Sequence, residues 1–370
     1  MIPFLERLGR KPFQVVWEIT LACNMSCRHC GSRAGRARAD ELSTAEALKL
    51  CQDLADLGTQ RLTLAGGEPT LRQDWDLLAK TLVSLGIRTN ILSNGRTWSR
   101  ELAQRARAAG LRSVGFSMDG CEVTHDYIRR VGGQWQGVID AIRLSREEGL
   151  DVSVVTQLNT ANVAELEAMH ALLGGLGVRA WQLQLGNPSG NMADHPELVL
   201  PPESVLDIVP RIAALREKGA APRIFVGDNI GYFGPYEQLL RDQGGPIPFW
   251  IGCRAGMTVL GIESDGNVKG CLSLPSAQNG VDRFVDGNIR EKPLREIWEH
   301  KQSFAYNRSF DRDTLVEACR TCDFADVCRG GCSWSSFSHT GECRGTPHCY
   351  HLQASLKAAR ESQGAAHGSR

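Results

Sequence analysis

Three cysteines lie within eight residues near the start of the chain, in the stretch LACNMSCRHCGSRAG (21–35). They are Cys23, Cys27 and Cys30, separated by three and then two residues. Closely spaced thiolates are ligands for zinc and for iron–sulfur clusters. A structural zinc site needs four ligands in a closed tetrahedron, so a fourth would have to come from elsewhere. A [4Fe–4S] cluster on three thiolates leaves one iron open for a ligand that is not protein, and we favour this interpretation.

A second group of cysteines lies in the last third of the chain. Eight of the thirteen cysteines belong to it: Cys253, Cys271, Cys319, Cys322, Cys328, Cys332, Cys343 and Cys349. The run from Cys319 to Cys332, taken alone, also fits a zinc ribbon. Two separate groups of ligands indicate a boundary between two domains. Cys51 and Cys121 are isolated, and we expect them to be small core residues.

The composition excludes several kinds of partner. Lys and Arg together number 42, as do Asp and Glu, so no basic footprint for nucleic acid is predicted. The first residues lack the apolar core and cleavage site of a signal peptide, and no apolar run approaches the length of a membrane span. We therefore expect a cytoplasmic protein with no nucleic-acid or membrane partner. Because the cytosol keeps thiols reduced, a disulfide framework is not expected.

The elements that must position the first cysteines form a βα repeat. Strands are predicted over 13–20, 61–66, 88–94, 112–118, 151–158 and 180–185. Helices are predicted over 43–57, 74–85, 98–109, 134–148 and 161–176, the first opened by a capping box of Ser43 and Glu46. Such alternation predicts an α/β fold with a parallel sheet wound into a full or partial barrel, whose functional groups gather at the C-terminal strand ends. The first cysteines follow the first strand and so lie at that end.

The spacing of these cysteines after a first strand resembles the signature of radical S-adenosylmethionine (radical SAM) enzymes. GGEPTLR (66–72), after the second strand, resembles the methionine-binding motif of that family. The resemblance extends from about residue 13 to residue 185 and implies a partial (β/α)6 TIM-type barrel. It also implies that S-adenosylmethionine binds the open iron. The reduced cluster then cleaves it to methionine and a 5'-deoxyadenosyl radical, which abstracts a hydrogen atom from substrate.

The same resemblance implies a set of cofactor-binding residues. These are Gly66, Gly67, Glu68 and Pro69 in the second motif, Ser93 and Asn94 in LSNG (92–95), Ser117 and Asp119 in SMDG (117–120), and Arg130. The glycines let backbone approach the methionyl group and Glu68 supplies charge near its ammonium. Two alternatives remain open: NG and DG are also common turns that close strands, and Arg129 and Arg130 also fit a solvated helix end. No catalytic base is identified.

The second group of cysteines, from about residue 249 to residue 350, resembles the SPASM domain, which binds two auxiliary [4Fe–4S] clusters. By that pattern the first auxiliary cluster is held by Cys253, Cys271 and Cys332, and the second by Cys319, Cys322, Cys328 and Cys349. Cys343 either completes the first cluster or leaves it with an open iron, and we expect completion. The chain would then hold three [4Fe–4S] clusters. The expected division is an N-terminal extension (1–12), the barrel (13–222), a linker (223–252), the SPASM domain (253–350), and a C-terminal helix and tail (351–370).

SPASM proteins mostly resemble enzymes that modify peptides and proteins. We therefore expect a radical SAM oxidoreductase or crosslinking maturase for a peptide or protein substrate, with a flavodoxin- or ferredoxin-type electron donor. Leu272 follows Cys271 where formylglycine-forming enzymes usually carry an acidic base, which argues against sulfatase maturation. Only about a dozen residues precede the first strand, so we expect any leader peptide to be read by a separate protein or by the barrel. The alternative substrate is a tetrapyrrole or another small molecule. A binding module without catalysis is the hypothesis of another class.

Overall fold

The computed structural model describes residues 10–242, 248–275 and 282–368. Within these ranges one ten-stranded sheet has the order β10-β9-β8-β1-β2-β3-β4-β5-β6-β7. Its parallel strands from β1 onward are β1 (Gln14–Thr20), β2 (Arg61–Gly66), β3 (Arg88–Ser93), β4 (Ser113–Ser117), β5 (Asp151–Leu158), β6 (Ala180–Leu185) and β7 (Arg223–Val226). The first six confirm the strands predicted from the sequence.

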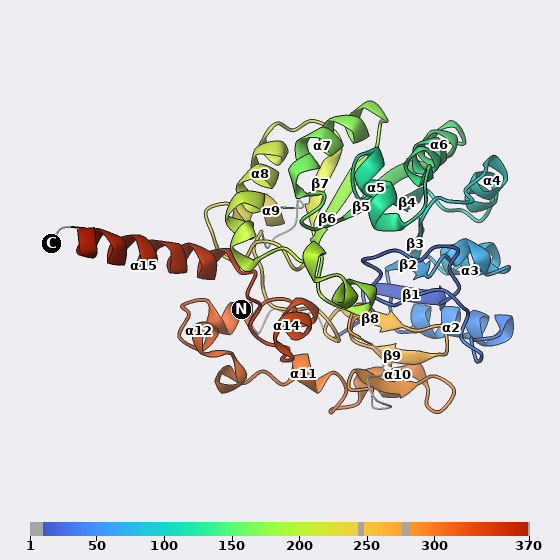
Figure 1. The fold of residues 1–370 in the computed structure, drawn as a ribbon. Helices are drawn as coiled ribbons and strands as arrows, with labels where there is room; N and C mark the ends of the chain where they lie inside the picture. Colours follow the sequence, from blue (N-terminus) through green and yellow to red (C-terminus); the bar gives the residue numbers. More distant parts are fainter. Residues whose placement is uncertain (1–9, 243–247, 276–281, 369–370) are drawn as a thin grey trace.

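Helices cover the outer face of this sheet, as Figure 1 shows. They are α2 (Thr44–Asp56), α3 (Trp75–Ser84), α4 (Arg100–Ala108), α6 (Gln134–Glu147), α7 (Leu166–Gly175) and α8 (Val205–Glu217). Ser43 and Glu46 form the predicted capping box at the start of α2. Leu50 and Cys51 of α2 are buried against a core that includes Trp17 of β1. Cys51 is thus the core residue that the sequence predicted.

Three parts of the barrel were not predicted. Helix α5 (Glu122–Arg129) lies between β4 and α6, helix α8 follows β6, and strand β7 pairs with β6 inside the range expected to be a linker. That range also contains α9 (Glu237–Arg241). Strand β7 has only four residues after a Gly- and Pro-containing turn, so its periodicity was too short to detect. The expected extension (1–12) lies outside the described residues except for 10–12.

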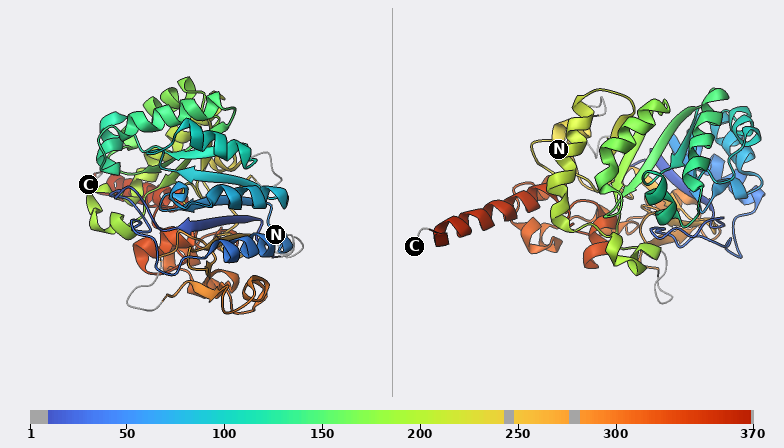
Figure 2. Two further views of the ribbon diagram at one scale, coloured as in Figure 1. Left: turned by 90° about the vertical axis from the view of Figure 1, so that its right-hand side faces the viewer. Right: turned by 45° about the horizontal axis from the view of Figure 1, so that its top comes forward.

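The C-terminal region continues the barrel sheet past β1. Strand β8 (Val259–Ile262) is parallel to β1, and β9 (Asn267–Lys269) and β10 (Val285–Asn288) follow it antiparallel. The remaining helices are α10 (Leu294–Glu299), α11 (Ala305–Arg308), α12 (Glu317–Arg320), α13 (Ala325–Cys328), α14 (Ser333–Thr340) and α15 (Tyr350–Gly368). Helix α15 projects from the body of the molecule (Figures 1 and 2). The 3₁₀ turns are η1 (Pro69–Leu71), η2 (Val163–Glu165), η3 (Gly190–Asp194), η4 (Pro196–Leu198), η5 (Pro202–Ser204) and η6 (Arg312–Thr314).

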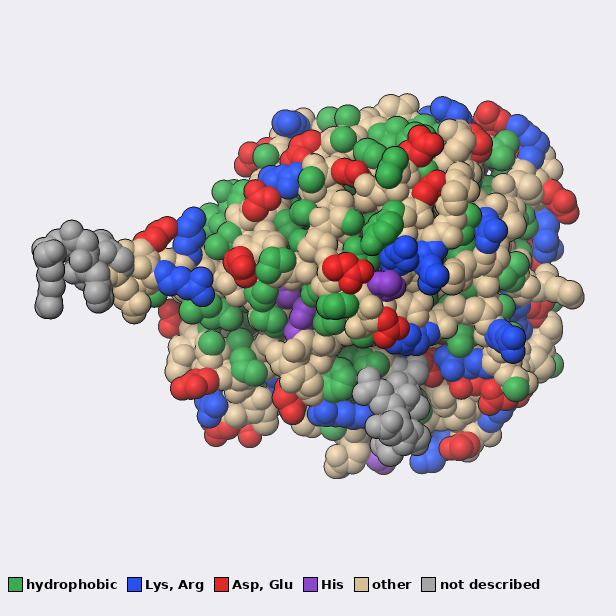
Figure 3. All heavy atoms as spheres, viewed as in Figure 1, with side chains coloured by type: hydrophobic (Ala, Val, Ile, Leu, Met, Phe, Trp, Pro, Cys, Tyr) green, Lys and Arg blue, Asp and Glu red, His purple; other side chains and the backbone are tan. Residues whose placement is uncertain are grey.

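The surface carries both signs of charge. Basic and acidic side chains intermingle over the face in Figure 3, in line with the formal net charge of zero. No described helix combines the length and apolar character needed to cross a membrane.

Candidate active site

Hydrogen bonds join the two ends of the cysteine loop after β1 (21–35) and attach the loop to η3. The Cys23 amide donates to the Gly35 carbonyl (2.9 Å), which joins the two ends of the loop. Asn191 in η3 donates from its backbone to the Cys30 carbonyl (2.8 Å) and from Nδ2 to the Cys27 carbonyl (2.9 Å). The loop is therefore fixed in shape before any ligand binds.

The three thiols of this loop lie close enough to influence one another. Burial, with a smaller contribution from Cys27 and Cys30, raises the pKa of Cys23 to about 11. Donors point at the sulfurs: Asn94 Nδ2 lies 3.8 Å from Cys23 Sγ and Arg129 Nη1 lies 3.7 Å from Cys27 Sγ. Because buried thiolates repel one another, they need a cationic partner, and iron would supply it.

The Gly66–Gly67 turn packs directly against the cysteine loop. A Cβ on Gly66 would lie 2.2 Å from the Thr20 carbonyl oxygen, and one on Gly67 would lie 2.3 Å from the Ala22 carbonyl oxygen. The Gly67 and Glu68 amides instead donate to those two carbonyls, at 2.9 and 2.7 Å. The close approach of two backbones therefore requires glycine at both positions.

Glu68 holds the predicted cofactor-binding loops together. Its buried carboxylate accepts hydrogen bonds from Thr70 Oγ1 (2.6 Å), Ser93 Oγ (2.9 Å) and the Asn94 amide (2.7 Å). Burial raises the pKa of Glu68, although these hydrogen bonds oppose it. Ser93 and Asn94 are thereby brought beside Cys23, and Pro69 begins η1 directly after Glu68. The structure thus gives Glu68 a fixing role, while its contact with a methionyl ammonium stays a prediction.

Asp119 is the centre of a second buried polar group. Its carboxylate accepts from His29 Nε2 (2.9 Å), Arg129 Nε (2.7 Å) and the Gln157 amide (2.9 Å). Burial raises the pKa of Asp119, but the Arg129 guanidinium and His29 outweigh it and hold that pKa well below its usual range. Arg130 has an exposed side chain, so it is Arg129 that the fold brings to the cysteine loop.

A cavity of about 330 Å³ opens at the C-terminal ends of the strands. The predicted residues Gly66, Ser117 and Asp119 line it, and so does Cys271. The barrel and the C-terminal region therefore share one cavity. Its volume is that of a small-molecule site.

Four thiols of the C-terminal region gather beside this cavity. Burial raises the pKa of Cys332, and the Cys253 and Cys271 thiols raise it further. Burial, with a smaller contribution from Cys253, raises the pKa of Cys343 to about 11. Cys343 packs in one apolar group with Cys271, and its role as a fourth ligand stays a prediction.

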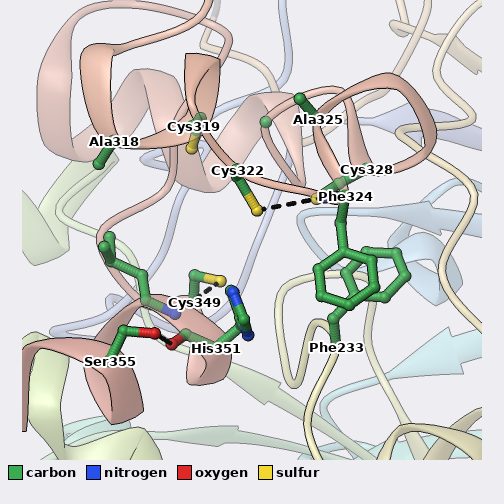
Figure 4. Close-up of a pocket in the computed structure, with 12 residues that line it drawn as sticks. Phe233, Ala318, Cys319, Cys322, Phe324, Ala325, Cys328, Cys349, His351 and Ser355 are labelled. Carbon is green, nitrogen blue, oxygen red and sulfur yellow. Dashed lines mark hydrogen bonds between the residues drawn. The ribbon is translucent and has the colours of Figure 1, made fainter. Parts of the chain in front are cut away.

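The other four thiols line a separate pocket, shown in Figure 4. These are Cys319, Cys322, Cys328 and Cys349, the set expected for the second auxiliary cluster. Most of the remaining wall is apolar, with Phe233 stacked on Phe324 at 4.2 Å between ring centres. Four thiols on one pocket wall are a donor set that suits an iron–sulfur cluster.

Comparison with known protein families agrees with both halves of this arrangement. A family model described as the Radical SAM superfamily matches residues 17–173. A second model, SPASM, described as an iron–sulfur cluster-binding domain, matches residues 253–323. The chain is a radical SAM enzyme with a SPASM domain. S-adenosylmethionine and iron–sulfur clusters are its cofactors.

Relatives of this radical SAM enzyme have names that indicate different functions. The AdoMet-dependent heme synthase of Methanosarcina barkeri is 28% identical over 351 residues, which cover 91% of this chain and 96% of the relative. The Fe-coproporphyrin III synthase of the same organism is 29% identical, with coverages of 87% and 83%. The mycofactocin maturase MftC of Mycolicibacterium smegmatis is 29% identical, with coverages of 91% and 82%. The family is therefore clear, whereas the substrate class is not settled by these relatives.

Solved structures of two radical SAM enzymes share the fold. Streptococcus suis SuiB bound to precursor peptide SuiA matches with a TM-score of 0.69 and 16% identity, covering 94% of this chain and 77% of SuiB. The enzyme anSMEcpe with bound AdoMet and Cp18Cys peptide matches with a TM-score of 0.69 and 17% identity, covering 96% and 99%. At these identities the likeness concerns the fold.

One charged group on the cavity wall of this radical SAM enzyme was missed by the sequence analysis. Glu18 of β1 is buried, and its Oε1 accepts from Arg38 Nη2 (3.0 Å) and Ser264 Oγ (2.9 Å). Oε2 makes no hydrogen bond to the described residues, and Glu18 lines the cavity. Burial raises the pKa of Glu18, and Arg38 counteracts this. A lone acidic residue in the otherwise apolar run FQVVWEIT is the signal that could have revealed it.

Proposed function

We propose that this radical SAM enzyme removes a hydrogen atom from a peptide or protein substrate and completes an oxidation or crosslink within it. The proposal includes three [4Fe–4S] clusters: one in the barrel (13–222) and two in the SPASM domain (253–350). When bound, the barrel cluster and S-adenosylmethionine supply the radical that takes the hydrogen atom. A flavodoxin- or ferredoxin-type donor and a separate leader-recognition protein belong to the same proposal.

Different residues of this chain would bind the barrel cluster and S-adenosylmethionine. Cys23, Cys27 and Cys30 would hold the barrel cluster, and the fixed loop between them leaves one iron without a protein ligand. Gly66 and Gly67 would admit the methionyl group beside that iron. The polar residues Ser93, Asn94, Ser117 and Asp119 near these glycines or on the cavity wall would contact the rest of the cofactor. The Asp119 carboxylate orients Arg129 toward Cys27 and keeps this cation fixed.

The charge of the cavity wall is the observation that carries the peptide assignment. Among the described residues that line it, three are acidic, namely Glu18, Asp119 and Glu263. Arg129 is the one Lys or Arg in that lining, and it is already bound to Asp119, while Glu18 and Glu263 are paired with Arg38 and Lys269 behind the wall, so the described lining offers a carboxylate no unpaired cation. A tetrapyrrole that bears several carboxylates would need cations to bind, because unpaired like charges in a buried site are costly. A neutral or cationic peptide segment suits this wall better.

A tetrapyrrole substrate is the second candidate. The heme synthase and Fe-coproporphyrin III synthase of Methanosarcina barkeri align with most of this chain, and this similarity favours it. On this alternative, the substrate carboxylates would have to bind outside the acidic wall.

A direct comparison of the two substrates tests the proposal. The anaerobically reconstituted enzyme would be given S-adenosylmethionine, dithionite and either a short peptide encoded beside its gene or iron-coproporphyrin III. We expect the peptide, and not the tetrapyrrole, to accelerate 5'-deoxyadenosine formation and to lose mass as hydrogen atoms leave. Deuterium from a labelled peptide should appear in 5'-deoxyadenosine. The opposite preference would replace the peptide assignment with the tetrapyrrole one, and Cys30→Ala provides the inactive control.

A further inference from the structure

The Tyr306 hydroxyl lies near three thiols of the first auxiliary site, Cys253, Cys271 and Cys343, without a hydrogen-bond partner in the described residues. Tyr306 belongs to α11, and its ring packs edge-on against Phe284 with 5.4 Å between ring centres. The residue as a whole is partly exposed, but its hydroxyl oxygen is buried. No atom of the described residues accepts or donates a hydrogen bond there. A buried hydroxyl without a hydrogen bond is unfavourable, so we expect a hydrogen-bond partner that is not part of the described protein.

The fold makes room for this hydroxyl next to Cys271. A Cβ on Gly270 would lie 2.2 Å from Tyr306 Oη, so glycine is needed at that position to admit it. Gly270 immediately precedes Cys271 in the chain. Tyr306 also packs in one apolar group with Cys271 and Cys343. The hydroxyl thus occupies a space built beside two of the expected ligands.

The backbone around Tyr306 is fixed by further contacts. Arg344 Nη2 donates to the Tyr306 carbonyl (3.1 Å), and Arg344 follows Cys343. Asn307 Nδ2 donates to the carbonyls of Cys253 and Ala255, both at 2.7 Å. The segment that carries the hydroxyl is therefore attached to two ligand-bearing loops. A phenolic hydroxyl keeps its proton near neutral pH, so Tyr306 can act as a hydrogen-bond donor.

We propose that the Tyr306 hydroxyl donates a hydrogen bond to a sulfur atom of the first auxiliary cluster and raises the reduction potential of that cluster. This rests on the proposed function only in assigning a cluster to Cys253, Cys271, Cys332 and Cys343. Hydrogen bonds to the sulfurs are among the factors that set iron–sulfur potentials. The reduced cluster carries one more negative charge than the oxidised one, so a donor stabilises the reduced form. A higher potential suits a cluster that accepts one electron from the substrate radical, whose proton leaves to water.

The Tyr306→Phe variant of the reconstituted holoenzyme tests this assignment without any peptide. Redox titration followed by electron paramagnetic resonance should show one auxiliary signal with a more negative midpoint potential and the other two signals unchanged. Hyperfine spectroscopy in H₂O and D₂O should show that an exchangeable proton coupled to that cluster is lost. Iron content should equal that of the wild type. Tyr236→Phe is the matched control, because Tyr236 packs against Tyr350 away from the first auxiliary thiols, and its three potentials should not move.

A second replacement reverses the direction of the effect. Substituting 3,5-difluorotyrosine at position 306 makes the hydroxyl a stronger donor, so the same midpoint should become more positive. An unchanged midpoint in Tyr306→Phe with full iron content would overturn the proposal. Loss of four irons from Tyr306→Phe would also overturn it, in favour of a role in cluster assembly. Wild-type protein without iron on these cysteines would instead overturn the cofactor assignment, a failure that iron analysis of the wild type separates from the other two.

Discussion

At the scale of single residues, Asp119 links the cysteine loop to the barrel. One buried carboxylate binds His29 of the loop, Arg129 of α5 and the backbone of β5. Arg129 in turn donates to Cys27 Sγ, so a buried ion pair of fixed geometry lies beside one expected iron ligand. A buried ion pair of this kind stabilises little by itself, but removing one partner leaves the other charge uncompensated. Its value therefore lies in fixing where Arg129 points.

Asp119→Asn should lower the free energy of unfolding by about 3 kcal/mol, because Arg129 would stay buried without its counter-charge. The folded pKa of Asp119 is depressed, so the wild-type contribution is present above the unfolded pKa and is lost as pH falls through the folded one. Denaturant unfolding of the anaerobic protein at neutral pH measures the loss. Asp194→Asn removes an exposed partner of Arg33 and should change little. Equal stability of the two variants would contradict the importance given to Asp119.

Glu18→Gln should raise the KM for a cationic peptide by roughly tenfold, because this carboxylate lines the cavity and contacts to a charged group are worth about 1.5–3 kcal/mol. Uncoupled 5'-deoxyadenosine formation should stay at the wild-type rate, since the cysteine loop is untouched. Steady-state kinetics with peptides that do and do not carry a Lys near the modified residue measure the effect. A loss in kcat with KM unchanged would show that Glu18 does not bind the substrate.

At the scale of elements, long periodic segments were predictable and short non-local ones were not. The six strands and the helices α2, α3, α4, α6 and α7 have enough residues to show their periods, and they occur where expected, whereas α5 and α8 were missed. Strands β7 to β10 have three or four residues each, and β8 takes its place only by pairing with β1, far away in the sequence. The cysteines could be proposed as iron ligands because their spacing repeats a pattern. Glu18 and Tyr306 follow no pattern, and only the fold brings them to their sites.

Gly67→Ala should separate the two loops that hold the cofactor-binding residues. The added Cβ would lie 2.3 Å from the Ala22 carbonyl oxygen, so the backbone must shift, at a cost of about 1–3 kcal/mol. We expect weaker S-adenosylmethionine binding in equilibrium dialysis and little 5'-deoxyadenosine. Gly137→Ala in α6 meets no atom within 4 Å and should leave binding intact while stabilising the helix by about 0.5–1 kcal/mol. Binding by Gly67→Ala as strong as that of the control would be inconsistent with this close packing.

At the scale of the whole molecule, the SPASM domain completes the cavity. Because β8 continues the sheet past β1, the loop after β9 carries Cys271 onto the cavity wall. Trp334 of α14 lines the same wall and packs beside both groups of auxiliary thiols. The second auxiliary pocket lies beside the start of α15 and is separate from the cavity. An electron that leaves a substrate in the cavity would therefore meet the first auxiliary site and then the second.

Iron content tests this arrangement as a whole. The reconstituted wild type should hold about twelve irons from three four-iron clusters, and replacing Cys23, Cys27 and Cys30 together should remove about four. Cys328→Ala should keep 5'-deoxyadenosine formation, since its thiol belongs to the second auxiliary pocket. A protein that contained zinc alone would contradict the cluster assignment.

Cys343→Ala asks whether the first auxiliary cluster is closed. Cys343 is buried, packs with Cys271 and lies within electrostatic reach of Cys253, so it is placed to bind the iron that three other thiols leave open. A fully thiolate-bound cluster accepts electrons without binding substrate, because none of its irons has a free position. We therefore expect Cys343→Ala to form 5'-deoxyadenosine, to change the electron paramagnetic resonance of one auxiliary cluster, and to lose final product. Cys51→Ala, which removes a core thiol far from these ligands, should keep all three signals. Unchanged auxiliary signals and product yield in Cys343→Ala would mean that the first auxiliary cluster has an open iron at which a substrate group can bind.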